Sequence, residues 1–196
     1  MNMELDETQE KIINATFKIL ENEGIEKVTT KKIASEAEVN EVTIFRKFQT
    51  KNNLIAVAKD YYIEIFIQKL EDVFDFTGEE EMEEYFRNCF KGILNLSESD
   101  FNLIKIAIEE VRSGPEKKSL LITILDAIIS KLETFFKLQQ EKGNVKDINP
   151  RVLSVMCYSM IFQSVTLWKI YESEPNLDME LYGKGFLDVF FNGIKP

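Results

Sequence analysis

The 196-residue chain is long enough for one large or two small domains with a buried core; 44% of its residues are hydrophobic and 30% are charged. Its formal net charge is −10, and it contains no histidine and no Gly-rich phosphate-binding loop. These absences remove the Ser-His-Asp and Cys-His nucleophile systems and the usual zinc and di-iron helix motifs, so we expect no enzyme, no metal site and no cofactor.

The first third of the chain predicts three short helices followed by a long fourth helix. Side chains that cap helix N-termini stand at each expected start, and a glycine stands where the first helix should end. These residues are Asp6 (in a capping box with Gln9), Thr29, Asn40 and Thr50 for the starts, and Gly24 for the end. We expect the fourth helix to continue to about Phe74.

The remainder predicts longer amphipathic helices, separated by the few glycines and prolines. The expected ranges are approximately 77–94, 99–111, 119–142, 150–172 and 178–191. The acidic run at 79–84 is interpreted as a solvated helix start, favoured by the helix dipole, and not as a metal site. The sequence therefore predicts an all-α protein.

Two features indicate a cytoplasmic protein that does not cross a membrane. The first residues lack the basic-then-apolar order of a signal peptide, and the uncharged run from Val152 to Trp168 contains several serines, as a buried helix would. Cys89 and Cys157 lie in apolar stretches and predict buried free thiols in a reducing compartment, with a redox pair as the alternative.

The block from Thr29 to Leu54 predicts a helix-turn-helix: a helix over 30–37, a three-residue turn and a capped helix over 41–48. Its inner side would be packed by Ile33, Ala34, Ala37, Val39, Ile44 and Phe48. Thr43, Arg46 and Lys47 would then face outward, toward a DNA major groove.

The charge of this block also indicates DNA. Between Lys27 and Lys51 the chain holds six cationic and three acidic residues, a local balance of +3 in a chain of net charge −10. The pairs Thr30-Lys31 and Thr50-Lys51 each place a cation at a helix N-terminus, which is a seat for a phosphate. We therefore expect double-stranded DNA as a partner.

The same block resembles the N-terminal signature of tetracycline-repressor-like (TetR family) regulators. The matching pattern is Thr29, Ile33-Ala34, Ala37, Val39, Thr43-Ile44-Phe45, Phe48, Thr50-Lys51 and Leu54. Four positions depart from the family's usual residues: Glu38 replaces Gly in the turn, Asn40 replaces Ser as the cap, Phe45 replaces Tyr, and Lys47 replaces His or Tyr.

The resemblance implies a dimeric transcriptional regulator, usually a repressor, with a three-helix DNA-binding head (1–50) joined by the long helix to a ligand-binding and dimerisation body (51–196). It implies a palindromic operator and release from DNA by a ligand. The DNA-binding residues we expect are Thr30, Lys31, Glu41, Val42, Thr43, Phe45, Arg46, Lys47, Thr50 and Lys51. Glu41 either accepts from cytosine N4 or only serves the helix dipole, and Arg46 contacts either a base edge or a phosphate.

The helix over 150–172 is apolar on almost every side, so we expect one side in a homodimer interface with the last helix and the other in a core or cavity. The binding site of an apolar small-molecule effector would be lined by Phe86, Phe90, Ile104, Ile108, Met156, Met160, Gln163 and Trp168, unless these are ordinary core residues. Two rival hypotheses stay open. One is a helical adapter that keeps a relic head without binding DNA, and the other is a carboxylate-dependent helical enzyme.

Overall fold

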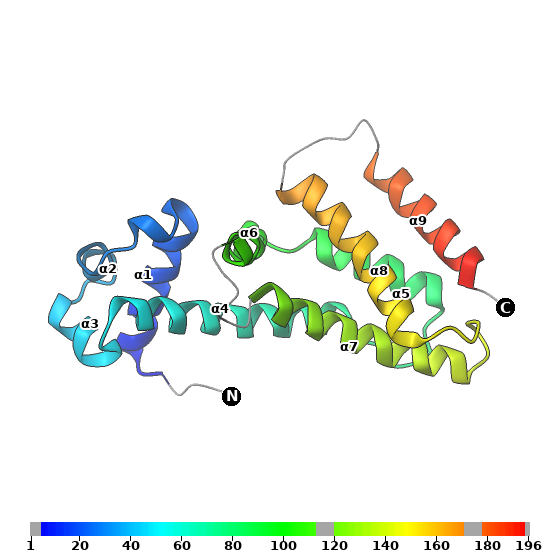
Figure 1. Ribbon diagram of the computed structural model, residues 1–196, viewed down its shortest axis with the longest axis horizontal. Coiled ribbons are helices and arrows are strands. Elements are labelled where there is room, and N and C mark those ends of the chain that lie inside the picture. The colour runs from blue at the N-terminus through cyan, green and yellow to red at the C-terminus, as the bar shows by residue number, and fades with distance from the viewer. Residues whose placement is uncertain (1–4, 113–119, 171–177, 195–196) are drawn as a thin grey trace. The chain divides into compact units, whose positions relative to one another are not determined.

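The computed structural model describes residues 5–112, 120–170 and 178–194, and within these ranges it contains helices and turns and no strand (Figure 1). The predicted all-α fold is therefore confirmed. The chain forms two compact units, Met1–Phe66 and Ile67–Pro196, and the division falls inside the long fourth helix. The chain breaks predicted near Gly114 and at 173–176 lie outside the described residues.

The N-terminal unit consists of short helices that precede the long one. They are α1 (Glu7–Glu23), the 3₁₀ turn η1 (Ile25–Lys27), α2 (Thr30–Glu36), α3 (Glu41–Phe48) and the first part of α4 (Lys51–Val73). All four predicted helix starts are confirmed by hydrogen bonds that cap the helices. The acceptor side chains are Asp6 (from Gln9 N), Thr29 (from Lys32 N), Asn40 (from Val42 N) and Thr50 (from Asn53 N).

The core of this unit forms where the apolar stripe of α1 meets α2, α3 and α4. It contains Ile12, Ile13, Phe17, Leu20, Ile33, Ile44, Phe48 and Leu54, all buried. The ring of Phe17 stacks on that of Tyr62 with centroids 3.8 Å apart, and the Tyr62 hydroxyl donates to Asn14 Oδ1 at 3.0 Å. These contacts attach α4 to α1.

The C-terminal unit contains the rest of α4 and five longer helices. These are α5 (Met82–Leu94), α6 (Glu98–Arg112), α7 (Leu120–Glu141), α8 (Pro150–Val165) and α9 (Met179–Ile194). The predicted helix over 150–172 is corrected in one respect, because the regular α-helix ends at Val165 and a π-helical turn, η2 (Thr166–Ile170), follows it.

An aromatic cluster joins α5, α7 and α9 at the centre of this unit. The Tyr85 ring stacks on Phe135 with centroids 4.1 Å apart, and Phe86 contacts the rings of Phe135, Phe136, Phe190 and Phe191. Edge-to-face and stacked aromatic pairs each add stability beyond the area that they bury. The cluster therefore fixes α9 against α5 and α7.

The two cysteines are buried and free, as predicted. Burial raises the pKa of the Cys89 thiol to about 12, and it also raises that of Cys157. Both thiols are therefore protonated at neutral pH. Among the described residues, no helix is both long and apolar enough to cross a lipid bilayer.

Candidate nucleic-acid interface

The turn between α2 and α3 is a Schellman motif with a non-glycine residue in the left-handed position. Val39 N donates to Ala34 O at 3.0 Å, and Glu38 N donates to Ser35 O at 3.4 Å. Glu38 itself has a φ of 55°, a region that favours glycine. The left-handed position of this motif is usually occupied by Gly, so Glu38 adopts the conformation under strain.

Residues one helical turn apart form the outer face of α3. Val42 and Phe45 expose 71% and 48% of their surface, and Arg46 beside them is also exposed. Ile44 and Phe48 point to the core, as the pattern predicted. Because two large apolar side chains are exposed next to each other on one short helix, this face has the character of a contact surface.

Lys47 is predicted to face outward, but the structure corrects that placement. Only 19% of its side chain is exposed, and its Nζ lies 2.5 Å from Asp6 Oδ2 at the N-terminus of α1. The hydrogen bond from Lys47, together with that from the Gln9 backbone, lowers the pKa of Asp6. Lys47 thus connects α3 to α1 within the unit, and Arg46 is the exposed cation of the helix.

Thr30 and Glu41 join the first turns of α2 and α3. The Thr30 hydroxyl donates to Glu41 Oε1 at 2.9 Å, and both residues are half-buried. The carboxylate of Glu41 is therefore held in place at the start of α3, with its second oxygen left to accept another hydrogen bond. Thr43 on the same helix is half-buried as well.

The two predicted phosphate seats differ in how their cations are engaged. Lys31 is exposed at the start of α2. At the start of α4 the hydroxyl of exposed Thr50 caps the helix, and Lys51 Nζ donates to Val28 O at 3.1 Å. Lys51 is half-buried, and the hydrogen bond to the Val28 carbonyl fixes the position of its ammonium group.

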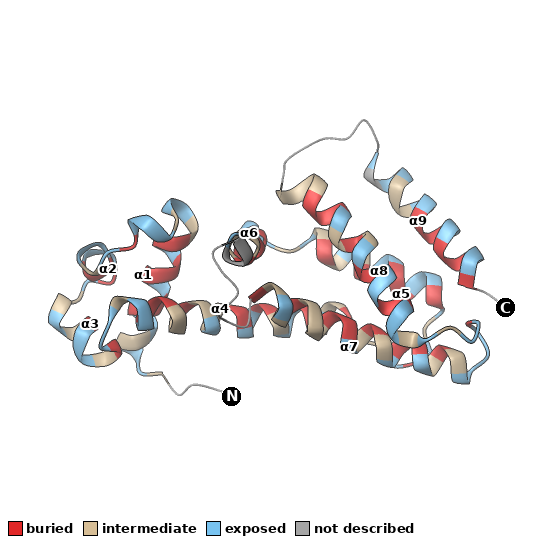
Figure 2. Cartoon of the chain, in the orientation of Figure 1, coloured by how far each residue is buried: buried red, intermediate tan, exposed pale blue. Residues whose placement is uncertain are grey.

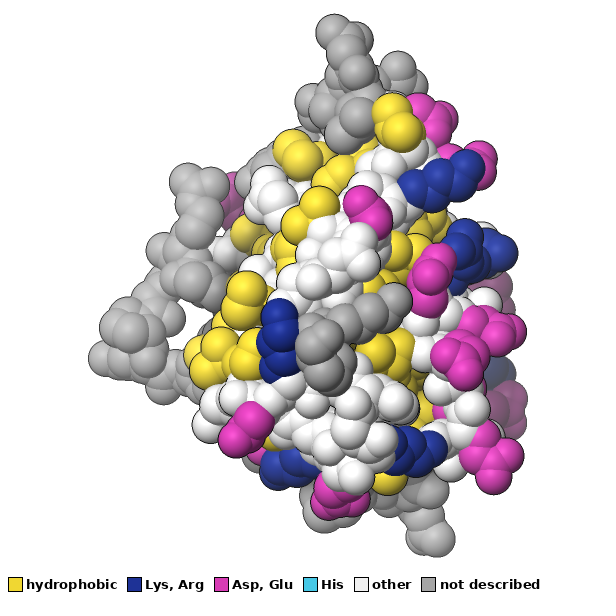
Figure 3. All heavy atoms as spheres, turned by 90° about the vertical axis from the view of Figure 1, so that its right-hand side faces the viewer, with side chains coloured by type: hydrophobic (Ala, Val, Ile, Leu, Met, Phe, Trp, Pro, Cys, Tyr) yellow, Lys and Arg dark blue, Asp and Glu magenta, His cyan; other side chains and the backbone are white. Residues whose placement is uncertain are grey.

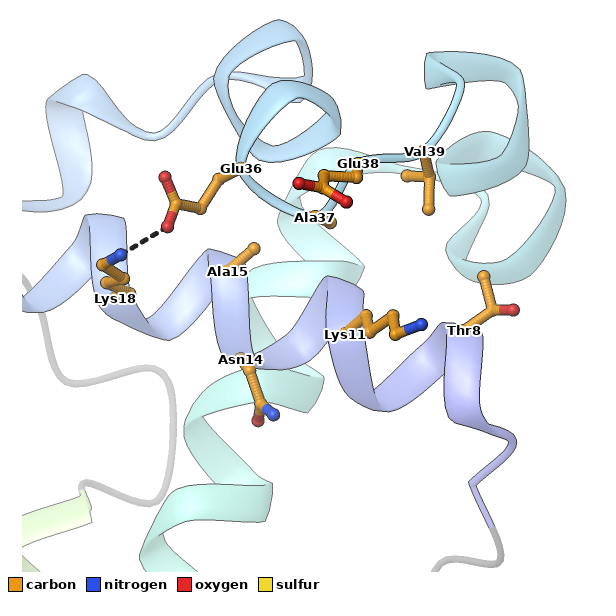
Figure 4. Close-up of a pocket in the computed structure, with 9 residues that line it drawn as sticks. All are labelled: Thr8, Lys11, Asn14, Ala15, Lys18, Glu36, Ala37, Glu38 and Val39. Carbon is orange, nitrogen blue, oxygen red and sulfur yellow. Dashed lines mark hydrogen bonds and ion pairs between the residues drawn. The ribbon is translucent and has the colours of Figure 1, made fainter.

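The opposite side of the turn is braced by α1. A groove of about 440 Å³ lies between α1 and the end of α2, and the Lys18–Glu36 ion pair at 2.5 Å spans it (Figure 4). Lys11 of α1 and Glu38 line the same groove (Figure 4). The ion pair thus joins α1 to the end of α2, directly before the turn that leads into α3.

Sequence reasoning did not indicate Asp6 or the Val28 carbonyl as partners of the predicted DNA-binding lysines. They lie 41 and 23 residues away from Lys47 and Lys51 along the chain. No local pattern reports a pairing at such separations. Only the fold brings these groups together.

The predicted ligand-lining residues occupy several different environments in the C-terminal unit. Phe86 and Ile104 are buried, while Ile108 and Met160 are half-buried. Phe90 lines a groove between α5 and α9. Met156 and Gln163 are exposed on α8, and Trp168 meets the Tyr182 ring edge-on with centroids 4.9 Å apart.

Comparisons with known proteins match the helix-turn-helix segment to a family of regulators. Residues 12–58 match the profile of the bacterial regulatory proteins of the tetR family. An uncharacterized HTH-type transcriptional regulator of Bacillus subtilis (strain 168), YvkB, is 42% identical over 48 residues, which is 24% of this chain and 25% of YvkB. The chain thus matches about a quarter of the length of this relative.

Solved structures show that the fold extends over almost the whole chain. A protein of Mesorhizobium loti superposes with a TM-score of 0.74 at 13% identity, covering 96% of this chain and 97% of that one. A TetR transcription regulator from Haloarcula marismortui gives a TM-score of 0.72 at 17% identity, with coverages of 98% and 100%. The helix-turn-helix segment, residues 12–58, is thus similar to the bacterial regulatory proteins of the tetR family, and the solved structures share the fold of the chain.

Proposed function

We propose that this protein is a DNA-binding transcriptional regulator, a repressor that binds a palindromic operator as a homodimer in the cytoplasm. Its head would place α3 in the major groove, with phosphates bound at the starts of α2 and α4. In a two-fold dimer the two copies of α3 would lie one helical turn apart, about 34–36 Å, or a multiple of that distance. An effector bound in the C-terminal unit would favour a dimer in which this spacing is wrong for DNA.

The outer face of α3 is the observation that carries this proposal. Val42, Phe45 and Arg46 lie side by side on it, and Glu41 stands at its first turn. Apolar atoms suit a thymine methyl group, a guanidinium suits guanine O6 and N7, and a carboxylate suits cytosine N4. The face therefore offers chemistry for direct base readout.

One observation favours the alternative, a helical adapter with a relic head. Two cations expected to contact phosphates, Lys47 and Lys51, already have partners inside the unit. An adapter would need them only to hold the helices together. The two hypotheses differ in what happens when Arg46, which forms no ion pair among the described residues, is neutralised.

The decisive experiment is selection of bound duplexes from a random DNA pool at moderate salt, followed by sequencing. We expect the wild-type protein to enrich a palindrome and Arg46→Ala to lose it, because a bidentate arginine contact contributes about 1–3 kcal/mol of base discrimination. Arg87→Ala is the matched control, since Arg87 is an exposed arginine of α5 in the C-terminal unit. Its selected sequences should equal those of the wild type.

A regulator and an adapter give opposite results. Enrichment of no sequence by the wild type, or identical enrichment by wild type and Arg46→Ala, would contradict base readout by α3. Lys31→Ala should weaken binding to all duplexes alike and reduce the salt dependence, because a phosphate contact carries no sequence information.

A further inference from the structure

A groove of about 410 Å³ lies between α5 and α9, within the C-terminal unit. Its surface is mainly apolar and is formed by Phe90 and Leu94 of α5 together with Phe186 and Leu187 of α9. Its volume falls in the range of small-molecule sites. The groove is bounded by two rigid helices that the aromatic cluster holds together.

Gly183 allows the groove to reach the ring of Phe90. A Cβ at this position would lie 3.5 Å from the nearest Phe90 ring atom, so α9 passes the ring with no side chain between them. Any side chain longer than a methyl group would enter the space that the groove occupies. The half-buried Phe90 ring thereby stays accessible from the groove.

Cations border this apolar surface in excess of acids. Arg87, Lys91 and Lys184 line the groove together with Asp178 and Glu180. Both acids are already engaged, because Asp178 accepts from Leu181 N at 2.9 Å and Glu180 pairs with Lys184 at 2.8 Å.

Lys91 is the cation of the groove that has no acidic partner among the described residues. Arg87 pairs with Glu83 at 2.8 Å, whereas Lys91 is exposed and forms no ion pair with any described residue. An anionic group at the rim would therefore meet an ammonium without an existing partner. A cationic ligand would meet like charge, and a neutral one would leave Lys91 unused.

From this geometry we infer that the groove between α5 and α9 binds an amphipathic anion, with its acyl chain along Phe90 and Leu94 and its head group at Lys91. Burial of the chain supplies most of the affinity, and the charge at the rim selects the anion. The exposed apolar residues of α9, Leu181 and Val189, lie on a different face of the helix. The groove is thus formed by one protomer, and the inference holds whether or not the protein binds DNA.

Isothermal titration with dodecanoate, below the concentration at which it forms micelles, tests this inference on the purified full chain. We expect saturable binding of one dodecanoate per protomer. Dodecanol and dodecyltrimethylammonium, which carry the same chain with a neutral or a cationic head, should bind about tenfold more weakly or not at all. Equal binding of the three probes, or no binding of dodecanoate, would overturn the inference.

Two variants locate the site. Lys91→Gln should weaken dodecanoate binding about three- to fivefold, the contribution of one exposed ion pair, while Lys137→Gln on α7 should leave it unchanged. Gly183→Leu should abolish binding by filling the groove, whereas Gly185→Leu, whose Cβ would meet open space, should not. Circular dichroism verifies that each variant is folded. Wild-type affinity in a folded Gly183→Leu protein would place the ligand elsewhere and refute the site.

Discussion

Glu38 holds a strained backbone conformation in the turn of the helix-turn-helix. Its φ of 55° is required by the hydrogen bonds that end α2 and lead into α3. For a residue with a Cβ, this conformation costs roughly 1–2 kcal/mol relative to the right-handed region. The charge of Glu38 offsets part of this strain by attracting the Lys11 ammonium. The pKa of Lys11 is raised mainly by its hydrogen bond to Glu7, and the charge of Glu38 contributes to the same shift.

Replacement of Glu38 by glycine should therefore stabilise the protein. We expect Glu38→Gly to raise the free energy of unfolding by about 0.5–1 kcal/mol, because the relief of strain exceeds the extra chain entropy of glycine in the unfolded state. Urea denaturation followed by circular dichroism measures the change. Glu38→Ala is the control, since it removes the charge and keeps the Cβ; an equal gain from alanine would show that charge, and not backbone strain, is responsible.

At the scale of elements, the start of α6 is fixed by a capping box that an ion pair ties to α4. Ser97 N donates to Asp100 Oδ2 at 2.9 Å, and Asp100 N donates to Ser97 Oγ at 3.3 Å. Lys69 of α4 donates to Asp100 Oδ1 at 2.7 Å. Burial acts to raise the pKa of Asp100, but the hydrogen bonds from Lys69 and Ser97 outweigh it, so the pKa is lowered.

The lowered pKa predicts a stability contribution that acid removes. Because the carboxylate is favoured in the folded state, its contribution is complete above the unfolded-state pKa of about 3.9 and is lost as the pH falls through the folded-state pKa. Asp100→Asn should cost about 1–2 kcal/mol at neutral pH, a value reduced for the exposure of Lys69, and progressively less below about pH 4. Urea denaturation at several pH values tests this.

Glu98→Gln provides the comparison for Asp100→Asn. Glu98 lies in the same first turn of α6 but is exposed to solvent. Its replacement should cost at most about 0.5 kcal/mol, the contribution of a charge to the helix dipole. A deficit of Asp100→Asn that stays constant down to about pH 3 would contradict the role assigned to its ionised form.

The sequence predicted those features that depend on residues a few positions apart. The four N-caps follow from side chains that reach backbone groups within three residues, and the turn at Glu38 follows from backbone hydrogen bonds that span three and five residues. The partner of Lys47 and the groove that Arg87 and Lys184 both line depend on helices far apart in the chain. Phe86 and Met156 are both expected to line an effector site, but only packing shows that Phe86 is buried and Met156 is exposed.

At the scale of the whole molecule, apolar side chains remain exposed along α8 and α9. Val152, Val155 and Met156 follow one face of α8, whose opposite face is buried (Figure 2), and Leu181 and Val189 of α9 expose 61% and 74% of their surface. Figure 3 shows hydrophobic side chains exposed on one face of the C-terminal unit, with charged side chains along its right-hand edge and at its lower left. The Tyr182 hydroxyl donates to Met160 O at 3.3 Å and connects the two helices. Large apolar side chains exposed on these two helices support the homodimer we propose.

A charge placed on this surface should separate the protomers. We expect the wild type to sediment as a dimer and Val155→Glu to sediment as a monomer at micromolar concentration, because a two-fold interface would bury the carboxylate twice without a cation. Ile25→Glu is the control: Ile25 is an exposed apolar residue of the N-terminal unit, so its replacement should leave the dimer intact. The Val155→Glu monomer should also lose the selected palindrome while keeping weak, salt-sensitive DNA binding, since each head then meets only one half-site. A dimer that survives Val155→Glu would move the interface away from α8 and remove the structural basis for the proposed spacing of the two recognition helices.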